Sequence, residues 1–583
     1  LIIPDRAGYI IRTDYISLRL RGCALTRRVK NFAFVRKRVS NNHLESSSFG
    51  ALLGTAVAGL TLYNSQTATY AQLMGNVADE LTCRLSTPWI SPDPLPSKRL
   101  AFIDGRIYFP TSKHFYYAAQ ALDIELIILD RPGHYLQRPE GADAELRKAF
   151  IELDLTRDAD LPQRIADAVR SYEEPIDAVV TICDPLLPFV ARANDILGCP
   201  TNPPQAFEVA IDKHKTRLLD EETDQALRIS SVGELETHLQ SNQVSPLRYP
   251  LIIKPCNGNG SEGVVKVATE AELLEEAERS FSRTPIGLQQ QSDLVIETYV
   301  DGPEVDVNIV LWNNKVVFCE VTDDFPSTSD HVIIQGALPT LNFLETQNVL
   351  PSRLPLAEQH MLQTQIHALV AKAGFHFGLL HCEARVKHSR AYYANSKSGV
   401  LDLQSHGDQV VAEPRTFLIE INARTPGYIA AAATHVTYGI DLFAMVLLSA
   451  ARDEQRLNSL AKPFDFSHRD PALRRTQFHA SILFIHPAFD DGGVLLSDLM
   501  EVRSMLIGNR PDLFGEETIP EWQPHFSKGD NVPGPASGEL YWLLDCVVTC
   551  TEGREKLLER CEEVRRALAE TIRMARVDVE ANS

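Results

Sequence analysis

The segment Phe417–Arg424, with the sequence FLIEINAR, carries a Glu, an Asn and an Arg at every second position of an otherwise apolar stretch. Because alternate side chains of a β-strand share a face, Glu420, Asn422 and Arg424 are expected to point the same way. Buried polar groups need partners, and a divalent cation with an anionic substrate would provide them. An internal salt bridge, or an edge strand that faces water, are the alternatives that this segment alone leaves open.

A glycine-rich loop lies between two apolar, strand-like segments. Its sequence, KPCNGNGSEGVV, contains Gly258, Gly260 and Gly263. Glycine lets backbone N–H groups approach a phosphate closely, whereas the alternative is a flexible hairpin tip. The loop lacks the GK[ST] of a Walker A motif. Lys254, which ends the apolar run LIIK, favours the phosphate interpretation, because a Lys there is poorly placed unless it meets an anion.

A second acidic strand has the sequence GLLHCEAR and carries Glu383 near its end, with His381 and Arg385 on the same face. The carboxylates of Glu383 and Glu420 and the amide oxygen of Asn422 are hard oxygen ligands of the kind that Mg²⁺ prefers. Combined with a phosphate loop, they indicate magnesium–nucleotide chemistry. His381 and Glu383 also match the H-x-E of zinc deaminases, but the partner motif P-C-x-x-C is absent from the sequence.

The elements that must position these residues follow an α/β pattern. From residue 98, strands and helices alternate, which predicts a parallel sheet. The expected strands there are 99–105, 125–130 and 176–184, and the expected helices are 112–124 and 161–172. Further along, we expect helices at 207–222 and 357–374, a hairpin turn at Asn313–Asn314, strands at 377–386 and 416–424, and an inserted polar loop at 387–414.

Composition narrows the function classes. The 583 residues carry 57 Lys and Arg against 77 Asp and Glu, a net charge of −20, which argues against a general nucleic-acid surface. Residues 1–44 differ, with ten Lys and Arg against two Asp. This basic segment predicts a mitochondrial transit peptide, a disordered tail or a wrongly chosen start. Scattered cysteines without CxxC pairs, and no apolar run of about 18 residues, predict a protein of the cytoplasm without a membrane span.

The motifs, taken in order along the chain, resemble the ATP-grasp superfamily of carboxylate–amine ligases. They are Lys213, Lys254 with its glycine loop, VIETYVDGPEVDV, Glu383, and Glu420-x-Asn422-x-Arg424. The closest likeness is to L-amino-acid (dipeptide) ligases and carnosine synthase. The resemblance implies an α/β (α+β) ATP-grasp fold with four parts. These are an N-terminal extension that is partly disordered (1–97), an N-terminal α/β pre-ATP-grasp domain (98–204), the ATP-grasp core (205–450) and a C-terminal α+β lobe (451–583).

The resemblance also implies a role for each matching residue. Lys213 and Lys254 would contact the ATP phosphates, and Arg424, with Lys254, would stabilise the transferred phosphoryl group. The metal ligands would be Glu383, Glu420 and Asn422. The other expected nucleotide-binding residues are Gly258, Asn259, Gly260, Ser261 and Gly263 in the loop, Glu297, Tyr299 and Val300 at the adenine, and Glu304 at the ribose.

The implied reaction joins a small-molecule carboxylate to an amine, with an amino acid as one substrate, through an acyl-phosphate. Its cofactors would be ATP and two Mg²⁺ ions, with Mn²⁺ as an alternative, and a pathway of secondary metabolism would be one setting. Residues 325–340 stand where such enzymes carry a substrate loop. A homodimer is compatible with the resemblance. The alternatives are a biotin-carboxylase-like or purine-type ligase and a non-catalytic nucleotide-binding regulator.

Overall fold

The computed structural model describes residues 96–105, 112–138, 140, 143–220, 226–241, 246–258, 260–261, 263–282, 293–327, 330, 343–407, 412–466, 475–487, 489, 492–534 and 542–576. Short pieces of the first 95 residues are also described, the longest being helix α3 (Tyr70–Arg84). Asn259, most of the predicted extension and most of the segment 325–340 lie outside the described residues.

The N-terminal α/β domain is built on a four-stranded parallel sheet, as predicted. The strands lie in the order β7-β6-β5-β8, so the chain starts near the middle and reverses direction across the sheet. Their bounds are β5 (Lys98–Ile103), β6 (Ile124–Asp130), β7 (Ala149–Glu152) and β8 (Ala178–Thr181). The domain's helices are α4 (Lys113–Ala121), α5 (Leu161–Arg170) and α6 (Leu187–Leu197).

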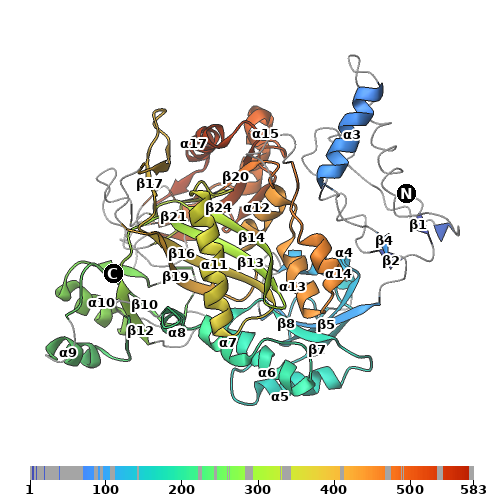
Figure 1. Ribbon diagram of the computed structural model, residues 1–583, viewed down its shortest axis with the longest axis horizontal. Coiled ribbons are helices and arrows are strands. Elements are labelled where there is room, and N and C mark those ends of the chain that lie inside the picture. The colour runs from blue at the N-terminus through green and yellow to red at the C-terminus, as the bar shows by residue number, and fades with distance from the viewer. Residues whose placement is uncertain are drawn as a thin grey trace.

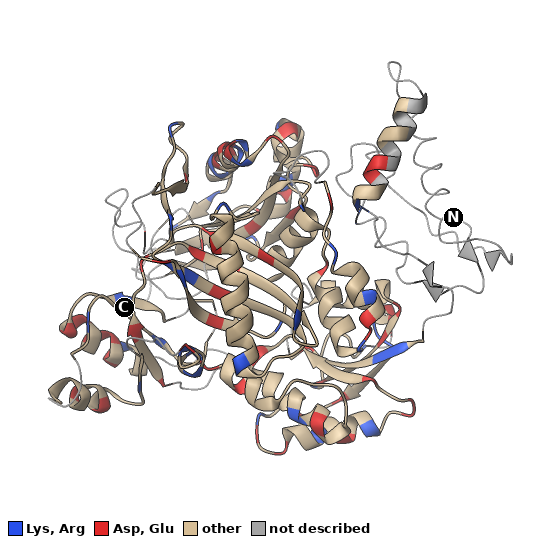
Figure 2. Cartoon of the chain, viewed as in Figure 1, with Lys and Arg blue, Asp and Glu red and all other residues tan. Residues whose placement is uncertain are grey.

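A small antiparallel sheet carries the lysine strand. Its strands lie in the order β11-β10-β12-β9, with bounds β9 (Ala226–Ile229), β10 (Leu251–Pro255), β11 (Val265–Val267) and β12 (Leu294–Thr298). Helices α9 (Val232–Gln240) and α10 (Glu270–Ser282) pack on it, at the lower left of Figure 1. Figure 2 shows that these outer helices carry acidic residues.

An eight-stranded sheet forms the centre of the molecule, in the order β19-β16-β13-β14-β15-β20-β24-β22. Its strands are β13 (Glu304–Trp312), β14 (Lys315–Asp324), β15 (Gln347–Leu350), β16 (Gly378–Lys387), β19 (Arg415–Asn422), β20 (His479–Ile485), β22 (Glu521–Pro524) and β24 (Leu544–Cys550). The sheet therefore continues across the predicted boundary at residue 450, and three strands of the C-terminal segment extend the sheet of the core.

Helices cover both faces of this sheet. Helix α11 (Leu356–Ala373) buries an apolar stripe against the odd-numbered residues of β13. Helices α12 (Tyr428–Tyr438) and α13 (Leu442–Ala450) pack against the opposite face together with the N-terminal domain. The other C-terminal elements are α14 (Glu454–Leu460), β21 (Gly492–Leu495), α15 (Leu499–Asn509), α16 (Pro511–Phe514), β23 (Asn531–Pro533), α17 (Arg554–Thr571) and β25 (Met574–Ala575).

Two local predictions are wrong. The helix predicted at 207–222 is broken into α7 (Pro204–Ala210) and α8 (Lys213–Arg217), because the Asp212 carboxylate caps the start of α8 by accepting a hydrogen bond from the backbone N–H of Lys215 at 3.1 Å. The polar segment 387–414 contains a β-hairpin, β17 (Ala391–Asn395) with β18 (Leu401–Ser405), rather than only a loop.

The hairpin turn predicted at Asn313–Asn314 is confirmed, since both residues have positive φ angles, 50° and 63°. Among the described helices, none alone is long and apolar enough to cross a membrane. Helices α12 and α13 satisfy that test only as a pair bent by 99°, and most of their side chains are buried in the core.

Candidate active site

Side chains that are all polar except Phe417 form three ranks, or rows of directly opposed residues, across one face of the large sheet. In the pairing of β13, β16 and β19, residues directly opposite one another share a face. The first rank is Asp306, Glu383 and Glu420; the second is Asn308, His381 and Asn422; the third is Glu304, Arg385 and Phe417. The face predicted from FLIEINAR is therefore one edge of a polar surface that three strands build together.

A β-bulge adjusts the end of β19 to this surface. Leu418 and Glu420 pair with consecutive residues of β16, so Ile419 is an extra residue in the ladder. Because of the bulge, Phe417, Ile419 and Glu420 all line the same cavity, while Leu418 is buried in the core. One short strand therefore supplies both apolar side chains and a carboxylate to the lining of the cavity.

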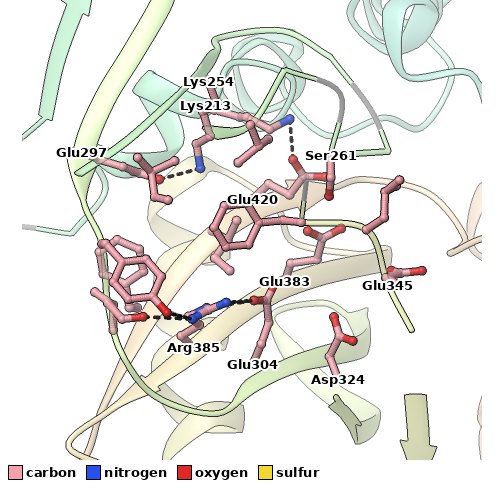
Figure 3. A pocket seen from close by; sticks show the side chains of 18 of the residues that line it. Lys213, Lys254, Ser261, Glu297, Glu304, Asp324, Glu345, Glu383, Arg385 and Glu420 are labelled. Atoms are coloured by element: carbon pink, nitrogen blue, oxygen red, sulfur yellow. Dashed lines mark hydrogen bonds and ion pairs between the residues drawn. The ribbon is translucent and has the colours of Figure 1, made fainter. Parts of the chain in front are cut away.

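The first and third ranks contribute Glu383, Glu420, Glu304, Arg385 and Phe417 to the lining of a cavity, and residues of the small sheet line it from the other side (Figure 3). Most of the predicted site residues come together here. Those that line the cavity are Lys213, Lys254, Gly260, Ser261, Glu297, Tyr299, Val300, Glu304, Glu383 and Glu420. The structure thereby brings together, in one place, segments that are separated by more than 200 residues along the chain.

Lys254 projects from β10 and is almost completely buried. Its ammonium group lies 2.5 Å from Glu297, whose other carboxylate oxygen lies 3.1 Å from the guanidinium of Arg217. Burial alone would raise the pKa of Glu297, but Lys254 and Arg217 outweigh it and lower the pKa. The side chain predicted to read adenine is therefore engaged in holding the lysine, and Arg217 also stacks 3.7 Å above the Phe417 ring.

Lys213 reaches the same cavity from the first residue of α8. Its Nζ lies 2.5 Å from Glu420 and donates a hydrogen bond to the Gly258 carbonyl at 2.9 Å. Burial favours the neutral form of Glu420, but the contact with Lys213 outweighs it and lowers the Glu420 pKa to about 2. Lys213 is thus held between the glycine loop and the predicted metal ligand.

Asn422 and Arg424 continue the polar series beyond Glu420. The Asn422 amide donates to Glu420 at 2.8 Å and accepts from Arg424 at 3.0 Å. Arg424 also forms a 2.7 Å ion pair with Asp184, which follows β8 in the N-terminal domain. The alternative of an internal salt bridge therefore describes part of this segment, and it joins two domains at the site.

The glycine loop has the backbone expected of a close approach. Gly260 and Gly263 have positive φ angles of 64° and 71°, and Ser261 between them has 56°. Such left-handed residues turn successive backbone N–H groups toward a concave side. Gly260 and Ser261 line the cavity, which is where a phosphate cradle is needed.

Arg385, which lies on the same rank as Glu304, contacts several of the residues that the sequence predicted to bind adenine and ribose. It forms ion pairs with Glu304 at 2.7 Å and Asp330 at 3.0 Å, and it donates to the Val300 carbonyl at 3.1 Å. The backbone N–H of Tyr299 donates to Pro250, so it supports β10 rather than facing a ligand. Arg385 therefore fixes the position of Glu304, the carboxylate that the sequence predicted to bind the ribose.

Comparison with known proteins agrees with this geometry. Residues 116–201 match the ATP-grasp N-terminal domain, and residues 247–396 match the ATP-grasp domain. An ATP-grasp enzyme of Aspergillus fumigatus, fsqD, is 32% identical over 97% of this chain and 96% of its own length. This chain belongs to the ATP-grasp family. Its recognition as an ATP-binding ligase with that fold is therefore confirmed.

More distant similarities concern the fold and parts of the chain. Carnosine synthase 1 of Gallus gallus is 25% identical over 54% of this chain and 31% of that protein. The crystal structure of L-amino acid ligase from Bacillus licheniformis covers 83% of this chain and 100% of its own, with a TM-score of 0.56 and 20% identity. ATP-grasp enzymes use ATP and magnesium, so the site is expected to contain a set of side chains that can bind Mg²⁺.

The donor set fits a magnesium ion. Glu383 and Glu420 lie opposite each other on neighbouring strands, and like charges in that position repel unless a cation lies between them. Burial and the nearby Glu420 raise the pKa of Glu383 well above its usual range. A metal at Glu420 would replace both the ion pair from Lys213 and the hydrogen bond from Asn422, which frees Lys213 for a phosphate.

Sequence reasoning missed several acidic residues at this site. Asp306 belongs to the first rank, and Asp324 and Glu345 line the far end of the cavity (Figure 3). Burial and neighbouring carboxylates raise the pKa of Asp306 to about 7 and that of Glu345 to about 8. The signal for Asp306 was available, because EVDVN places polar residues at every second position, as FLIEINAR does.

Proposed function

We propose that this ATP-grasp ligase forms an amide bond between a carboxylate and an amine through an acyl-phosphate, with an amino acid as one substrate. The observation that carries the proposal is the set of charged residues lining one cavity, in which the carboxylates of Glu383 and Glu420 lie with Lys213 and Lys254. Carboxylates can bind the metal ions of a metal-bound triphosphate, and fixed lysines can contact its phosphate oxygens. Transfer of the phosphoryl group depends on this positioning and charge neutralisation.

The residues of this chain would divide the work. Glu383, Glu420 and Asn422 would hold magnesium, which when bound neutralises the phosphates and polarises the transferred group. Lys254 is oriented by Glu297, and Lys213 is poised beside the glycine loop, so both can contact phosphate oxygens with little reorganisation. The loop at Gly260 and Ser261 would exclude water from a hydrolysable acyl-phosphate.

Arg424 would stabilise the acyl-phosphate itself. Its guanidinium is fixed on three sides, by Asp184, by Asn422 and by the Thr425 carbonyl at 2.7 Å. A planar cation held in this way binds the oxygens of a phosphoryl group with defined geometry. The carboxylate substrate would attack the γ-phosphate beside Arg424, which displaces ADP and forms the acyl-phosphate. The amine would then attack the acyl carbon and displace inorganic phosphate to give the amide.

Two observations support an amino-acid substrate. Carnosine synthase and L-amino acid ligase are among the similar proteins, and their names identify amino-acid chemistry. Asp324 and Glu345 also line the cavity, and among the described residues no Lys or Arg forms an ion pair with either. Their carboxylates would complement the ammonium group of an amino acid.

The test is ADP release by the purified protein with Mg-ATP, screened against amino acids singly and in pairs. We expect release to require one carboxylate and one amine. The double variant Glu420→Gln/Asn422→Ala should lose more than about 100-fold of this activity, because both act at the metal. The control is Glu413→Gln/Asn395→Ala, at two exposed positions, which should keep full activity. Normal turnover in the first variant would refute the metal assignment.

A further inference from the structure

His381, in the second rank, is held with one ring nitrogen turned toward the carboxyl groups of Asp306 and Glu383. It is 8% exposed, and its Nδ1 lies 3.1 Å from the Oδ1 of Asn308. The Asn308 amide is fixed from its other side, because its Nδ2 donates to Glu320 at 2.8 Å and Thr434 donates to the same carboxylate oxygen. This network assigns the Asn308 oxygen to the ring, so Nδ1 carries the proton.

The protonated Nδ1 leaves a lone pair on Nε2 of the neutral ring. Nε2 lies 4.0 Å from Asp306 Oδ1 and 3.9 Å from Glu383 Oε1, too far for a hydrogen bond to either. Within the part of the chain that the structure describes, the hydrogen bond made by the His381 ring is the one at Nδ1. Three electron-pair donors, two of them from carboxyl groups, therefore lie close together beside one another on neighbouring strands.

The spacing of these atoms suits a shared cation. The three ligand atoms all lie within 4.8 Å of one another. Two ligands that are each about 2.1 Å from one ion are about 3–4.2 Å apart, depending on the angle between them. The two measured separations from Nε2 fall in that interval, so an ion needs only a small closure of the carboxylates.

We propose that Asp306, His381 and Glu383 form a binding site for a divalent transition-metal ion of the Mn²⁺ or Zn²⁺ type. An imidazole ligand favours such ions over Mg²⁺, which prefers oxygen alone. The hydrogen bond from Nδ1 to Asn308 orients the ring as outer-sphere partners of metal-bound histidines do. The site shares Glu383 with the proposed magnesium site, but it is built without nucleotide and does not depend on the ligase reaction.

The site predicts that Mn²⁺ binds to nucleotide-free protein through nitrogen. Metal-stripped protein is titrated with Mn²⁺ and examined by pulsed electron paramagnetic resonance. We expect the wild type to show coupling to a directly bound ¹⁴N nucleus. His381→Gln should lose that coupling and weaken Mn²⁺ affinity by about 10–100-fold, and Asn308→Leu, which keeps all three ligands, should weaken it by about 10-fold.

His376→Gln is the matched control, because His376 is exposed and also has an Asn neighbour, Asn314, at 2.7 Å from its Nδ1. It should change neither the coupling nor the affinity. If His381→Gln does not fold, Asp306→Asn provides the second variant. We expect it to weaken Mn²⁺ binding, and we expect any Mn²⁺ that still binds to show the nitrogen coupling. Absence of nitrogen coupling in the wild type, or unchanged Mn²⁺ binding by His381→Gln, would overturn the site.

The two proposals fail in different measurements. Loss of amine-dependent ADP release with nitrogen-coupled Mn²⁺ intact would count against the ligase and leave this site standing. Reduced ligase activity in His381→Gln with unaltered Mn²⁺ coupling would instead assign the ring to proton transfer and overturn the metal site.

Discussion

At the scale of single residues, Glu320 is a buried carboxyl group that holds Asn308 of the second rank in place. It lies on β14, is buried, and accepts hydrogen bonds from Asn308 and Thr434. The pKa of Glu320 is raised to about 7, because the effect of burial outweighs that of the two hydrogen bonds, which lower the pKa. A carboxyl whose pKa is raised in the folded state favours folding fully below its unfolded pKa, and that contribution is lost as the pH rises through the folded pKa.

Glu320→Gln removes this titration and keeps an acceptor oxygen. We therefore expect the melting temperature of the variant, relative to wild type, to rise as the pH increases from about 4.5 to about 7 and then to level off. The limiting gain is on the order of 1–3 kcal/mol. The measurement is thermal unfolding at a series of pH values. Exposed Glu278→Gln is the control, and a pH-independent difference for Glu320→Gln would contradict the assignment.

Residue types and spacing predicted most of this site but not its full acid set. Glu420, Asn422 and Arg424 were found because their alternation stands out in an apolar strand. Asp306 was missed, although it alternates equally, because its place beside Glu383 depends on the register of β13 against β16. Register is fixed by packing and turns across the sheet, so it is not written in the local spacing of either strand.

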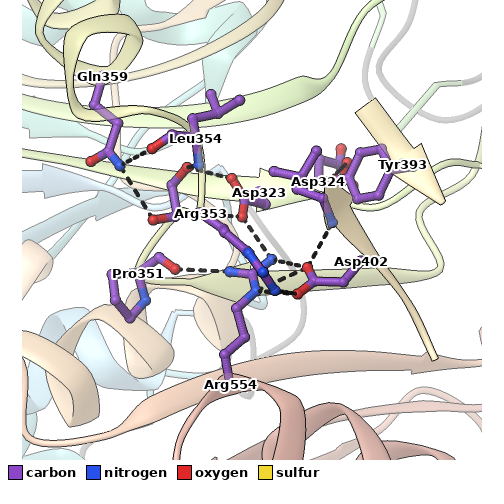
Figure 4. A network of polar contacts seen from close by, with 11 residues as sticks. Asp323, Asp324, Pro351, Arg353, Leu354, Gln359, Tyr393, Asp402 and Arg554 are labelled. Carbon is purple, nitrogen blue, oxygen red and sulfur yellow. Dashed lines mark hydrogen bonds and ion pairs between the residues drawn. The ribbon is translucent and has the colours of Figure 1, made fainter. Parts of the chain in front are cut away.

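At the scale of elements, the inserted hairpin β17–β18 joins the core to helix α17. Arg554, the first residue of α17, forms ion pairs with Asp402 of the hairpin at 2.9 Å and with Asp323 of β14 at 2.7 Å (Figure 4). Tyr393 of the hairpin donates to the backbone carbonyl of Asp324 at 2.9 Å. The hairpin thus contacts β14, the strand whose last residue, Asp324, lines the cavity.

Removing Arg554 would leave the buried carboxylate of Asp323 without an ion-pair partner in the described part of the chain, whereas Asp402 would keep its 2.5 Å ion pair with Arg353. We expect Arg554→Met to lose about 3–5 kcal/mol of stability, seen as a lower melting temperature. The double variant Arg554→Met/Asp323→Asn should regain part of that loss, because one uncompensated charge is gone. Arg510→Met, which removes an exposed arginine paired with Asp512, should leave the melting temperature unchanged. Equal melting temperatures for Arg554→Met and Arg510→Met would contradict this role.

Sequence periodicity found the regular elements and failed where polar side chains are buried by tertiary contacts. The segment 387–414 looks like a loop because it is polar, yet Asp402 is buried by its pairing with Arg554. The helix predicted at 207–222 has helical composition throughout, and the Asp212 cap divides it so that Lys213 begins α8 beside the cavity. In both places, a polar side chain that breaks the local pattern makes a contact that helps to position residues near the site.

At the scale of the whole molecule, the N-terminal domain enters the site through Asp184. This residue follows β8 at the carboxyl edge of the parallel sheet, beside the reversal of strand order between β5 and β8, where such sheets commonly bind ligands. Its ion pair with Arg424 joins that edge to the ATP-grasp core. The two parts of the molecule therefore position one proposed catalytic cation together.

Asp184→Asn tests whether this contact between domains serves the reaction. The amide keeps the shape but removes the charge that holds Arg424, so the guanidinium should lose its fixed orientation beside the transferred phosphoryl group. We expect kcat for ADP release to fall by about 10–100-fold while the Kd for Mg-ATP changes by less than about threefold, because the proposed ground-state contacts of the nucleotide are with Lys213, Lys254 and the glycine loop. Asp167→Asn, in the same domain and paired with Arg170 on the surface, should change neither quantity. An unaltered kcat in Asp184→Asn would show that Asn422 and the Thr425 carbonyl orient Arg424 without the N-terminal domain.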